Sequence, residues 1–345
     1  MKKQVYEYEN GEFKVSNNIT EKRVLVTHVD LDGAGCAVVA LLACDLSEIY
    51  YCGNGYDIDN TVMSLINEYK SGMYSRLDII IADNSVSESV AIELNDLTKE
   101  EPNFSVQLFD HHKSARWMDA YDWAVIDVNE CGTTLLFKNY RNTLSSRYTD
   151  AAYDRIGTFC NDVKCRDLWL WEEEHNNMAN IHNEYMYMLG IEKYVATIAN
   201  NIRSNKYDII SENDMKLVEQ AIAKKNKYVQ NHINDFYTKD ILAGDKTTPQ
   251  NCPRYRVAYT FANQYISELG NAICKAHDDI DICAMIVPTR GEYGAVELRA
   301  TKDNVDLAPL AKALGGGGHK HAAGFPLKKD FAEGIINSFA EMMSV

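Results

Sequence analysis

The feature that most constrains the fold is a regular alternation, in the first third of the chain, of short apolar runs with longer helix-like segments. The apolar runs are rich in Val, Ile and Leu, a composition that favours buried strands. They lie at residues 23–27, 48–52, 77–82, 105–109 and 123–127, and helices are expected at 34–44, 59–70 and 88–98. This order predicts an α/β fold, with a mostly parallel sheet covered by helices on both faces.

The rest of the 345-residue chain predicts two further parts. Residues 151–236 carry almost no strand signal and are expected to be helical, and residues 237–254 have the composition of a loop. A second α/β unit follows, with strands near 256–260, 282–288 and 295–300, and helices near 264–275, 306–314 and from 330 onward. We therefore expect an α/β domain at 1–150, a helical connector at 151–237 and a smaller α/β domain at 238–345.

Composition narrows the class of partner. The net charge is −15 at pH 7, whereas proteins that grip long nucleic acids normally present a basic face. No run of 18 apolar residues is present, and the first residues lack the apolar stretch of a secretory signal. We expect a cytoplasmic protein that binds neither membranes nor long nucleic acids.

Acidic and imidazole side chains follow three of the expected strands, where each strand ends. Because ligands bind beyond the carboxyl ends of parallel strands, these groups are expected to meet at one edge. They are His28, Asp30 and Asp32 after the first strand, Asp83 after the third, and Asp110, His111 and His112 after the fourth. One Asp after a strand is often only a helix N-cap, but so many crowded acids require compensating cations. The set predicts divalent metal ions, with room for a carboxylate that bridges two of them.

The same residues fall in motifs that resemble those of the DHH phosphoesterase superfamily. The segments HVDLDGAG (28–35), IADNS (81–85) and FDHHK (109–113) look like its first three motifs. Near the C-terminus, GGGGH (315–319) and AAGF (322–325) look like the glycine-rich motif of its DHHA1 accessory domain. The segments SELGN (267–271) and VELR (296–299) resemble the accessory domain of nano-RNase B type oligoribonucleases.

The resemblance implies a role for each group at the strand ends. His28 and Asp30 would hold a first metal ion, Asp32 and His111 a second, and Asp83 would bridge the two. His112 would lie beside the substrate phosphate as a donor to it or to the leaving oxygen. Asp110 would orient a histidine ring.

The superfamily needs one more Asp ligand, for which the chain offers two candidates. Asp127 closes the fifth expected strand and precedes Cys131-Gly132-Thr133-Thr134, which opens a helix. Asp167 lies in CRDLWLW (165–171), a run that resembles a segment of the nano-RNase B group. We favour Asp167, although the sequence does not place either residue in space.

The accessory domain is expected to bind substrate. The amides of a glycine run can surround an anion, which points to Gly316, Gly317, Gly318 and the neighbouring His319. Arg299, at the end of a strand, can hold a phosphate through two hydrogen bonds, or form only a surface ion pair. The active site is expected in the cleft between the two α/β domains.

The function predicted from these residues is a metal-dependent phosphodiesterase or exonuclease acting on very short oligonucleotides or on cyclic or linear dinucleotides. The alternatives are a phosphomonoesterase acting on pAp-like nucleotides and a nucleotide-binding module whose catalytic site has decayed. The expected cofactors are two divalent ions, Mn²⁺ first, with Mg²⁺, Fe²⁺ or Zn²⁺ as alternatives. The expected partner is a small nucleotide substrate, and homodimerisation is left open.

Overall fold

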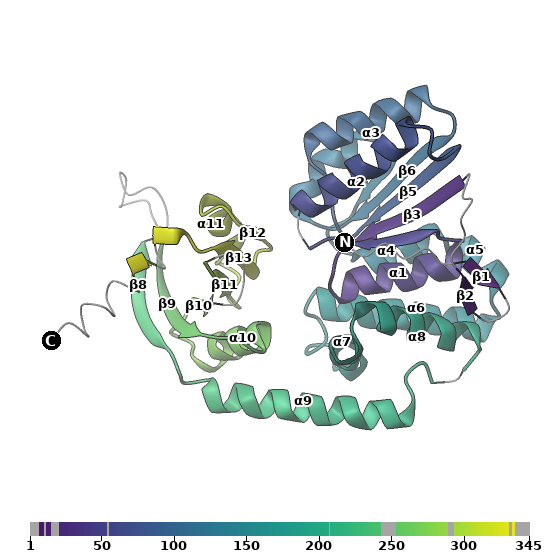
Figure 1. Ribbon diagram of the computed structural model, residues 1–345. Helices are drawn as coiled ribbons and strands as arrows, with labels where there is room; N and C mark the ends of the chain where they lie inside the picture. The colour runs from purple at the N-terminus through teal and green to yellow at the C-terminus, as the bar shows by residue number, and fades with distance from the viewer. Residues whose placement is uncertain are drawn as a thin grey trace. The chain divides into compact units, whose positions relative to one another are not determined.

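The chain divides into two compact units, Met1–Ala221 and Ile222–Val345 (Figure 1). The computed structural model describes residues 7–9, 12–14, 21–53, 55–206, 208–242, 253–288, 293–330 and 333–334.

The first unit is built on a five-stranded sheet in the order β4-β3-β5-β6-β7, in which every pairing is parallel. The strands are β3 (Glu21–Thr27), β4 (Glu48–Tyr51), β5 (Arg76–Ala82), β6 (Phe104–Asp110) and β7 (Ala124–Ile126). Their apolar runs are buried because helices cover both faces of the sheet. The predicted parallel α/β sheet is therefore confirmed.

Helices α2 (Gly55–Lys70) and α3 (Glu88–Glu100) pack on one face of this sheet. Helix α1 (Leu31–Ala43), rich in Ala, Gly and Val, lies on the other face with α4 (Gly132–Asn139) (Figure 1). All but one of the residues of α1 are buried, because further helices cover its outer side. Between β6 and β7 runs a short 3₁₀ segment, Lys113–Ala120.

The outer helical layer contains α5 (Arg141–Arg147), α6 (Asp150–Asp167), α7 (Asn177–Leu189) and α8 (Ile191–Arg203). Helices α6 and α8 pack directly on α1. This part of the expected connector therefore belongs to the first unit, because its apolar stripes bury the outer side of α1. The division between the units falls instead within α9 (Glu212–His232).

The second unit has a six-stranded sheet in the order β12-β13-β11-β10-β9-β8. Among the strands described in this unit, only β9 and β10 pair in parallel. The elements are β8 (Tyr237–Leu242), β9 (Arg254–Phe261), α10 (Ile266–Ala276), β10 (Ile282–Val287), β11 (Ala295–Arg299), α11 (Leu307–Ala313), β12 (Gly317–Gly318) and β13 (Ala322–Pro326). Two apolar clusters, one built on α10 and the other on α11, stabilise the unit.

Some elements differ from the sequence prediction. Strand β8 occupies part of the expected loop; it is a mostly exposed edge strand whose sequence, YTKDIL, lacks an apolar face. The short hairpin of β1 (Glu7–Glu9) and β2 (Glu12–Lys14) was not expected. Most of the helix expected from residue 330 lies outside the described residues. Among the described helices, none has the length and apolar character required to cross a bilayer.

Candidate metal centre

The carboxyl ends of β3, β5 and β6 bring the predicted acidic and imidazole groups together. Strand β3 leads into His28 and Asp30, β5 into Asp83, and β6 into the Asp110–His112 segment. Because the three strands are neighbours and parallel, all of these side chains emerge at one edge of the sheet.

His28 and Asp30 form the first part of the cluster. Asp30 caps α1 by accepting a hydrogen bond from the Gly33 amide at 3.1 Å, and its other oxygen lies 2.8 Å from His28 Nδ1. Burial disfavours both charged forms, but the contact between them outweighs burial, so the pKa of His28 is raised and that of Asp30 lowered. Only glycine fits at position 33, because a Cβ there would lie 2.2 Å from the His28 carbonyl oxygen.

Asp32 is buried against the N-terminus of α4. Its two carboxylate oxygens accept hydrogen bonds from the amides of Gly132 at 2.6 Å and Thr133 at 2.9 Å. The partial positive charge at a helix N-terminus stabilises this carboxylate. A Cβ at residue 132 would lie 2.8 Å from the Asp83 Cβ, so the approach requires glycine. Sequence reasoning missed this contact, although the CGTT segment that opens α4 was its signal.

Asp83 stands between the other groups. One of its oxygens lies 3.3 Å from His111 Nε2 and the other 4.0 Å from His28 Nδ1. Its backbone has a left-handed φ of +54°, which is uncommon outside glycine and typical of functional positions. Burial, together with the charges of Asp32 and Asp30, raises the pKa of Asp83 well above its usual range.

His111 is surrounded by three carboxylates. Besides its contact with Asp83, its Nε2 lies 3.5 Å from Asp167 and 3.9 Å from Asp32. Burial lowers the pKa of His111 despite these acids, which favours the neutral imidazole that metals bind.

Asp110 and His112 form a pair beside this cluster. Asp110 is fully buried and accepts hydrogen bonds from the His111 amide at 2.7 Å and from the His112 amide at 3.3 Å. The same oxygen lies 2.6 Å from His112 Nδ1. Burial opposes the imidazolium, but Asp110 outweighs it and raises the pKa of His112 to about 9. The ring is therefore cationic at neutral pH, and Asp110 fixes its orientation.

The two candidates for the last ligand differ in position. Asp167 ends α6 and reaches the cluster through its contact with His111. Asp127 instead accepts hydrogen bonds from the amide of Asn129 at 3.0 Å and from its side chain at 3.2 Å. The structure thus brings Asp167 into the site and uses Asp127 to form a turn.

The donor set fits divalent cations. Within the described residues, three groups hold ligand atoms that all lie within 4.8 Å of one another. They are His28, Asp30 and Asp83; Asp83, Asp110, His111 and His112; and Asp32, His111 and Asp167. One buried oxygen each of Asp83, Asp110 and Asp167 accepts no hydrogen bond from the described residues. Buried carboxylate oxygens in this state call for a cation, and Asp83 belongs to two groups.

Trp169 follows Asp167 by two residues and was not singled out by sequence reasoning as a site residue. The Arg166 guanidinium stacks 4.6 Å from the centre of its ring. Trp169 has a left-handed φ of +59°, which is a genuine outlier for a bulky residue. The turn that follows Asp167 is therefore held in a strained conformation by packing.

The predicted substrate-binding residues lie in the second unit. Arg299 ends β11 and is largely buried; its guanidinium donates to Ser267 Oγ and to the Leu298 carbonyl, each at 2.7 Å. Part of its hydrogen-bonding capacity therefore stabilises the domain. At least two N–H donors of the Arg299 guanidinium are engaged within the domain, so fewer donors can bind a phosphate than the sequence prediction assumed.

The glycine run folds as a hairpin strand rather than as an open anion cradle. Gly317 and Gly318 pair with β13, while the amides of Gly316 and His319 donate to the carbonyls of Ala311 and Ala322. At Gly318 the φ is +135°, and a Cβ would lie 2.5 Å from the Ala322 oxygen. Gly316 and Gly318 are thus required for close backbone packing, whereas a Cβ at Gly317 would meet nothing within 4 Å.

Comparison with known proteins agrees with the identity of the second unit and with the overall fold. Residues 256–344 match the DHHA1 domain family. This match covers the second unit, and together with the similarity to the relatives below it agrees with the resemblance to the DHH/DHHA1 phosphoesterase superfamily that the motifs indicated.

Two characterised proteins and one solved structure illustrate the relationship. Oligoribonuclease NrnB of Bacillus subtilis (strain 168) is 26% identical over 318 residues, which cover 90% of this chain and 74% of that protein. A 3′,5′-cyclic-nucleotide phosphodiesterase of Helicobacter pylori is 22% identical over 325 residues, covering 87% of this chain and 91% of that protein. RecJ of Thermus thermophilus, solved in complex with Mn²⁺, shares the fold with a TM-score of 0.51 at 12% identity. The match covers 94% of this chain and 52% of RecJ.

Proposed function

We propose that the protein is a metal-dependent phosphodiesterase that hydrolyses very short oligonucleotides, or linear or cyclic dinucleotides, to mononucleotides. The observation that carries the proposal is the set of three overlapping Asp/His groups at one edge of the sheet, two of which share Asp83. The names of the relatives, an oligoribonuclease and a cyclic-nucleotide phosphodiesterase, support the same substrate class.

In this proposal the groups divide between two divalent ions. His28 and Asp30 would hold one ion, His111 would hold the other together with Asp32 and Asp167, and Asp83 would be a ligand of both. The two oxygens of Asp83 already face these two sets, one toward His111 and one toward His28. Such a pair of ions supplies an activated water and neutralises charge on the phosphate. Mixed oxygen and nitrogen ligands suit Mn²⁺, which is our proposed ion.

His112 acts on the substrate in this scheme. Because Asp110 keeps its ring cationic and oriented, His112 is suited to donate a hydrogen bond to a phosphate oxygen or to the leaving oxygen. Its side chain is about one third exposed, whereas Asp110 is fully buried. The imidazolium is therefore accessible to a substrate, while its carboxylate counter-ion is not. The chain's own residues thus supply both the donor and its positioning group.

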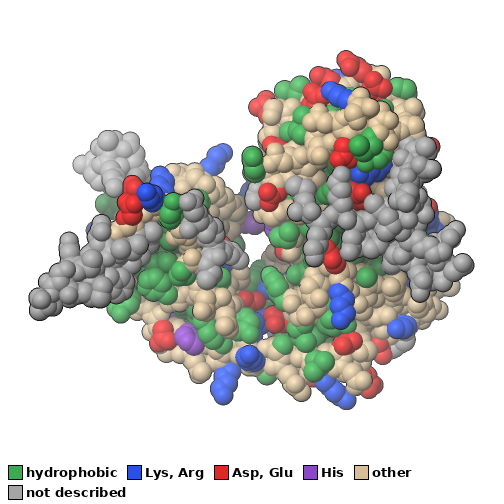
Figure 2. Space-filling view, viewed as in Figure 1, with side chains coloured by type: hydrophobic (Ala, Val, Ile, Leu, Met, Phe, Trp, Pro, Cys, Tyr) green, Lys and Arg blue, Asp and Glu red, His purple; other side chains and the backbone are tan. Residues whose placement is uncertain are grey.

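The surface charge explains the preference for short substrates. On the face drawn in Figure 2, the Lys and Arg side chains of the described residues are scattered among acidic ones and form no continuous basic band. With a net charge of −15, further phosphates of a long strand would meet a negative surface. Binding must then depend on a few contacts close to the metal ions. Arg299, Gly316–Gly318 and His319 remain our candidates for contacts in the second unit.

The proposal is tested by turnover of a substrate panel with Mn²⁺. The panel holds pApA, a five-nucleotide RNA, a 25-nucleotide RNA, a cyclic dinucleotide and pAp, with and without excess chelator. We expect chelator-sensitive hydrolysis of the dinucleotides and the five-nucleotide RNA, with kcat/KM falling beyond about five nucleotides because the available contacts are then saturated. Equal kcat/KM on pApA and the 25-nucleotide RNA at physiological salt contradicts the proposal, as does a preference for pAp.

A further inference from the structure

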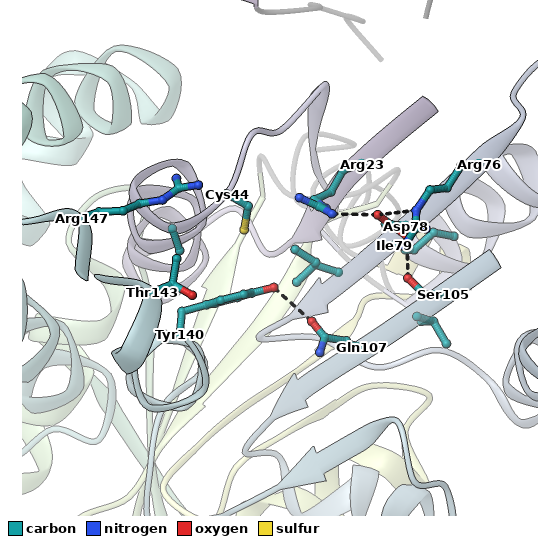
Figure 3. A pocket seen from close by; sticks show the side chains of 13 residues that line it. Arg23, Cys44, Arg76, Asp78, Ile79, Ser105, Gln107, Tyr140, Thr143 and Arg147 are labelled. Atoms are coloured by element: carbon teal, nitrogen blue, oxygen red, sulfur yellow. Dashed lines mark hydrogen bonds and ion pairs between the residues drawn. The ribbon is translucent and has the colours of Figure 1, made fainter. Parts of the chain in front are cut away.

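A polar pocket lies at the amino ends of β3, β5 and β6, which are the strand ends opposite the candidate metal centre (Figure 3). It has a volume of about 460 Å³ and is closed on one side by the end of α1 and by α5. Ligand pockets in proteins typically measure about 300–1,000 Å³, so the space suits a small organic molecule.

The sheet contributes a row of charged side chains to this pocket. The register pairs Arg23 with Asp78, and Asp78 with Ser105, so the three side chains share one face of adjacent strands. Asp78 accepts hydrogen bonds from Arg23 at 2.9 Å, from Arg76 at 3.2 Å and from Ser105 at 2.7 Å. These contacts overcome the effect of burial and lower the pKa of Asp78, so the carboxylate is ionised. One carboxylate thus faces two arginines.

Helix α5 adds a third arginine without adding a counter-ion. Arg147 extends toward Cys44 and Arg23 (Figure 3), and it forms no ion pair within the described part of the chain. Glu21 stands near Arg76 and Asp45 near Cys44, but neither acid lines the pocket. The lining therefore carries three guanidinium groups and one carboxylate, a net charge of +2 on a chain whose total charge is −15.

The other lining residues suit a flat, partly polar group. Strand β5 supplies the aliphatic side chain of Ile80, while Tyr140 donates a hydrogen bond to Gln107 at 3.0 Å. Tyr140 therefore offers a ring surface, and the Gln107 amide and the Thr143 hydroxyl offer polar groups of either kind. A site of this composition can hold both a phosphate and an attached base and sugar.

We propose that this pocket is a second binding site, separate from the metal centre, for a nucleoside monophosphate. A phosphate monoester is close to a dianion at neutral pH and therefore matches the excess of two guanidinium charges. Guanidinium groups bind phosphate through paired hydrogen bonds, and Arg147 is placed to complete the set. The proposal does not depend on the activity of the metal centre, because it rests on residues at the other end of the sheet.

The test is isothermal titration of the full chain, freed of divalent ions with EDTA, using AMP, adenosine and inorganic phosphate as probes. We expect one AMP per chain, phosphate at least five-fold weaker than AMP, and no measurable binding of adenosine. Arg147→Gln should weaken AMP binding at least five-fold. Arg141→Gln, an exposed arginine at the start of the same helix that does not line the pocket, is the matched control and should change it less than two-fold.

A second variant separates the two sites. Asp83→Asn alters the metal centre and should leave AMP binding unchanged within two-fold. The proposal is overturned if Arg147→Gln binds AMP as well as the parent chain, or if Asp83→Asn abolishes binding. It is also overturned if phosphate binds as tightly as AMP, since the pocket would then recognise only an anion. Thermal unfolding of each variant shows that the comparison is made on folded protein.

Discussion

The two ends of the central sheet carry opposite excesses of charge. At the carboxyl ends of β3, β5 and β6, three carboxylates surround the neutral His111, and one oxygen each of Asp83 and Asp167 accepts no hydrogen bond from the described residues. At the amino ends of the same strands, Arg23 and Arg76 share Asp78, and Arg147 lines the same pocket as a third arginine. Each end is incomplete by itself, the first needing cations and the second an anion. The same strands can thus present two binding chemistries that are separated by the length of a strand.

The largest expected effect comes from Asp83→Asn, which removes the carboxylate placed between the two ligand sets. We expect kcat/KM on pApA to fall at least ~10³-fold, because both ions lose a ligand. Without metal, the variant should be at least as stable as the parent, because a buried carboxylate of raised pKa has been neutralised. Mn²⁺-induced shifts in melting temperature, measured alongside activity, should shrink. Activity within ten-fold of the parent at saturating Mn²⁺ would show that Asp83 is not a shared ligand.

A matched pair of substitutions tests which Asp is the last metal ligand at the carboxyl ends of the strands. Asp167→Asn should lower kcat/KM about 10²-fold or more, because Asp167 faces His111. Asp127→Asn should change it less than about three-fold, since that side chain only forms a turn with Asn129. Steady-state kinetics on pApA with a titration of Mn²⁺ measure both. The assignment fails if the two variants lose activity equally.

A buried carboxylate away from both ends shows what burial alone does. Asp162 accepts a hydrogen bond from Asn176 at 2.8 Å and lies 3.8 Å from the neutral His182; burial raises its pKa to about 6. Since the folded pKa exceeds the unfolded value, the contribution of Asp162 to stability is fully present below about pH 4 and is lost as pH rises through about 6. A shift of this size corresponds to at most about 3 kcal/mol.

Asp162→Asn should therefore raise the melting temperature by about 2–5 °C above pH 7. The difference from the parent should vanish below about pH 4, where the carboxylate is protonated in both states. Burial lowers the pKa of His182 to about 3, so both proteins should also lose stability in common as pH falls below about 6.5. Melting curves from pH 3.5 to 8 provide the measurement. A stability difference that does not depend on pH would assign the effect to packing.

The smallest expected effect is that of Arg147→Gln on catalysis. The residue lies at the opposite end of the sheet from the metal centre, so kcat/KM on pApA, with no mononucleotide added, should stay within two-fold of the parent. A large loss would mean that the two ends of the sheet are not independent. The same kinetic assay, run at several substrate concentrations, separates KM from kcat.

The sequence predicted the carboxyl end of the sheet much better than the amino end. The end of each apolar run marks the end of a strand, so the sequence alone assigned His28, Asp83 and His111 to the carboxyl edge of the sheet. The choice between Asp127 and Asp167 could not be made that way, because it depends on where α6 ends relative to β6. Arg23 and Arg147 resemble ordinary surface charges in the sequence. Their meeting depends on a sheet register and a helix position that no local pattern encodes.

In the second unit, too, the structure differs from the sequence prediction where a segment pairs with a distant partner. The glycine run was expected to leave its amides open to a ligand, but pairing with β13 consumes several of them. Strand β8 has no apolar alternation because it is an exposed edge, so only its partner β9 reveals it. Patterns that depend on burial are readable from sequence, whereas those that depend on a distant partner are not.

The hydrogen bonds that Asp32 accepts from the amides of Gly132 and Thr133 have a consequence for protein engineering. A designer who wishes to change the preferred metal would normally exchange one carboxylate for a histidine or a cysteine. At residue 32 that exchange would also release the first turn of α4, which packs on both α1 and α6. Asp167 is the better position for retuning the metal, because it lies at the end of α6, whereas Asp30 caps the first turn of α1. Asp32 should be kept fixed in any library built on this scaffold.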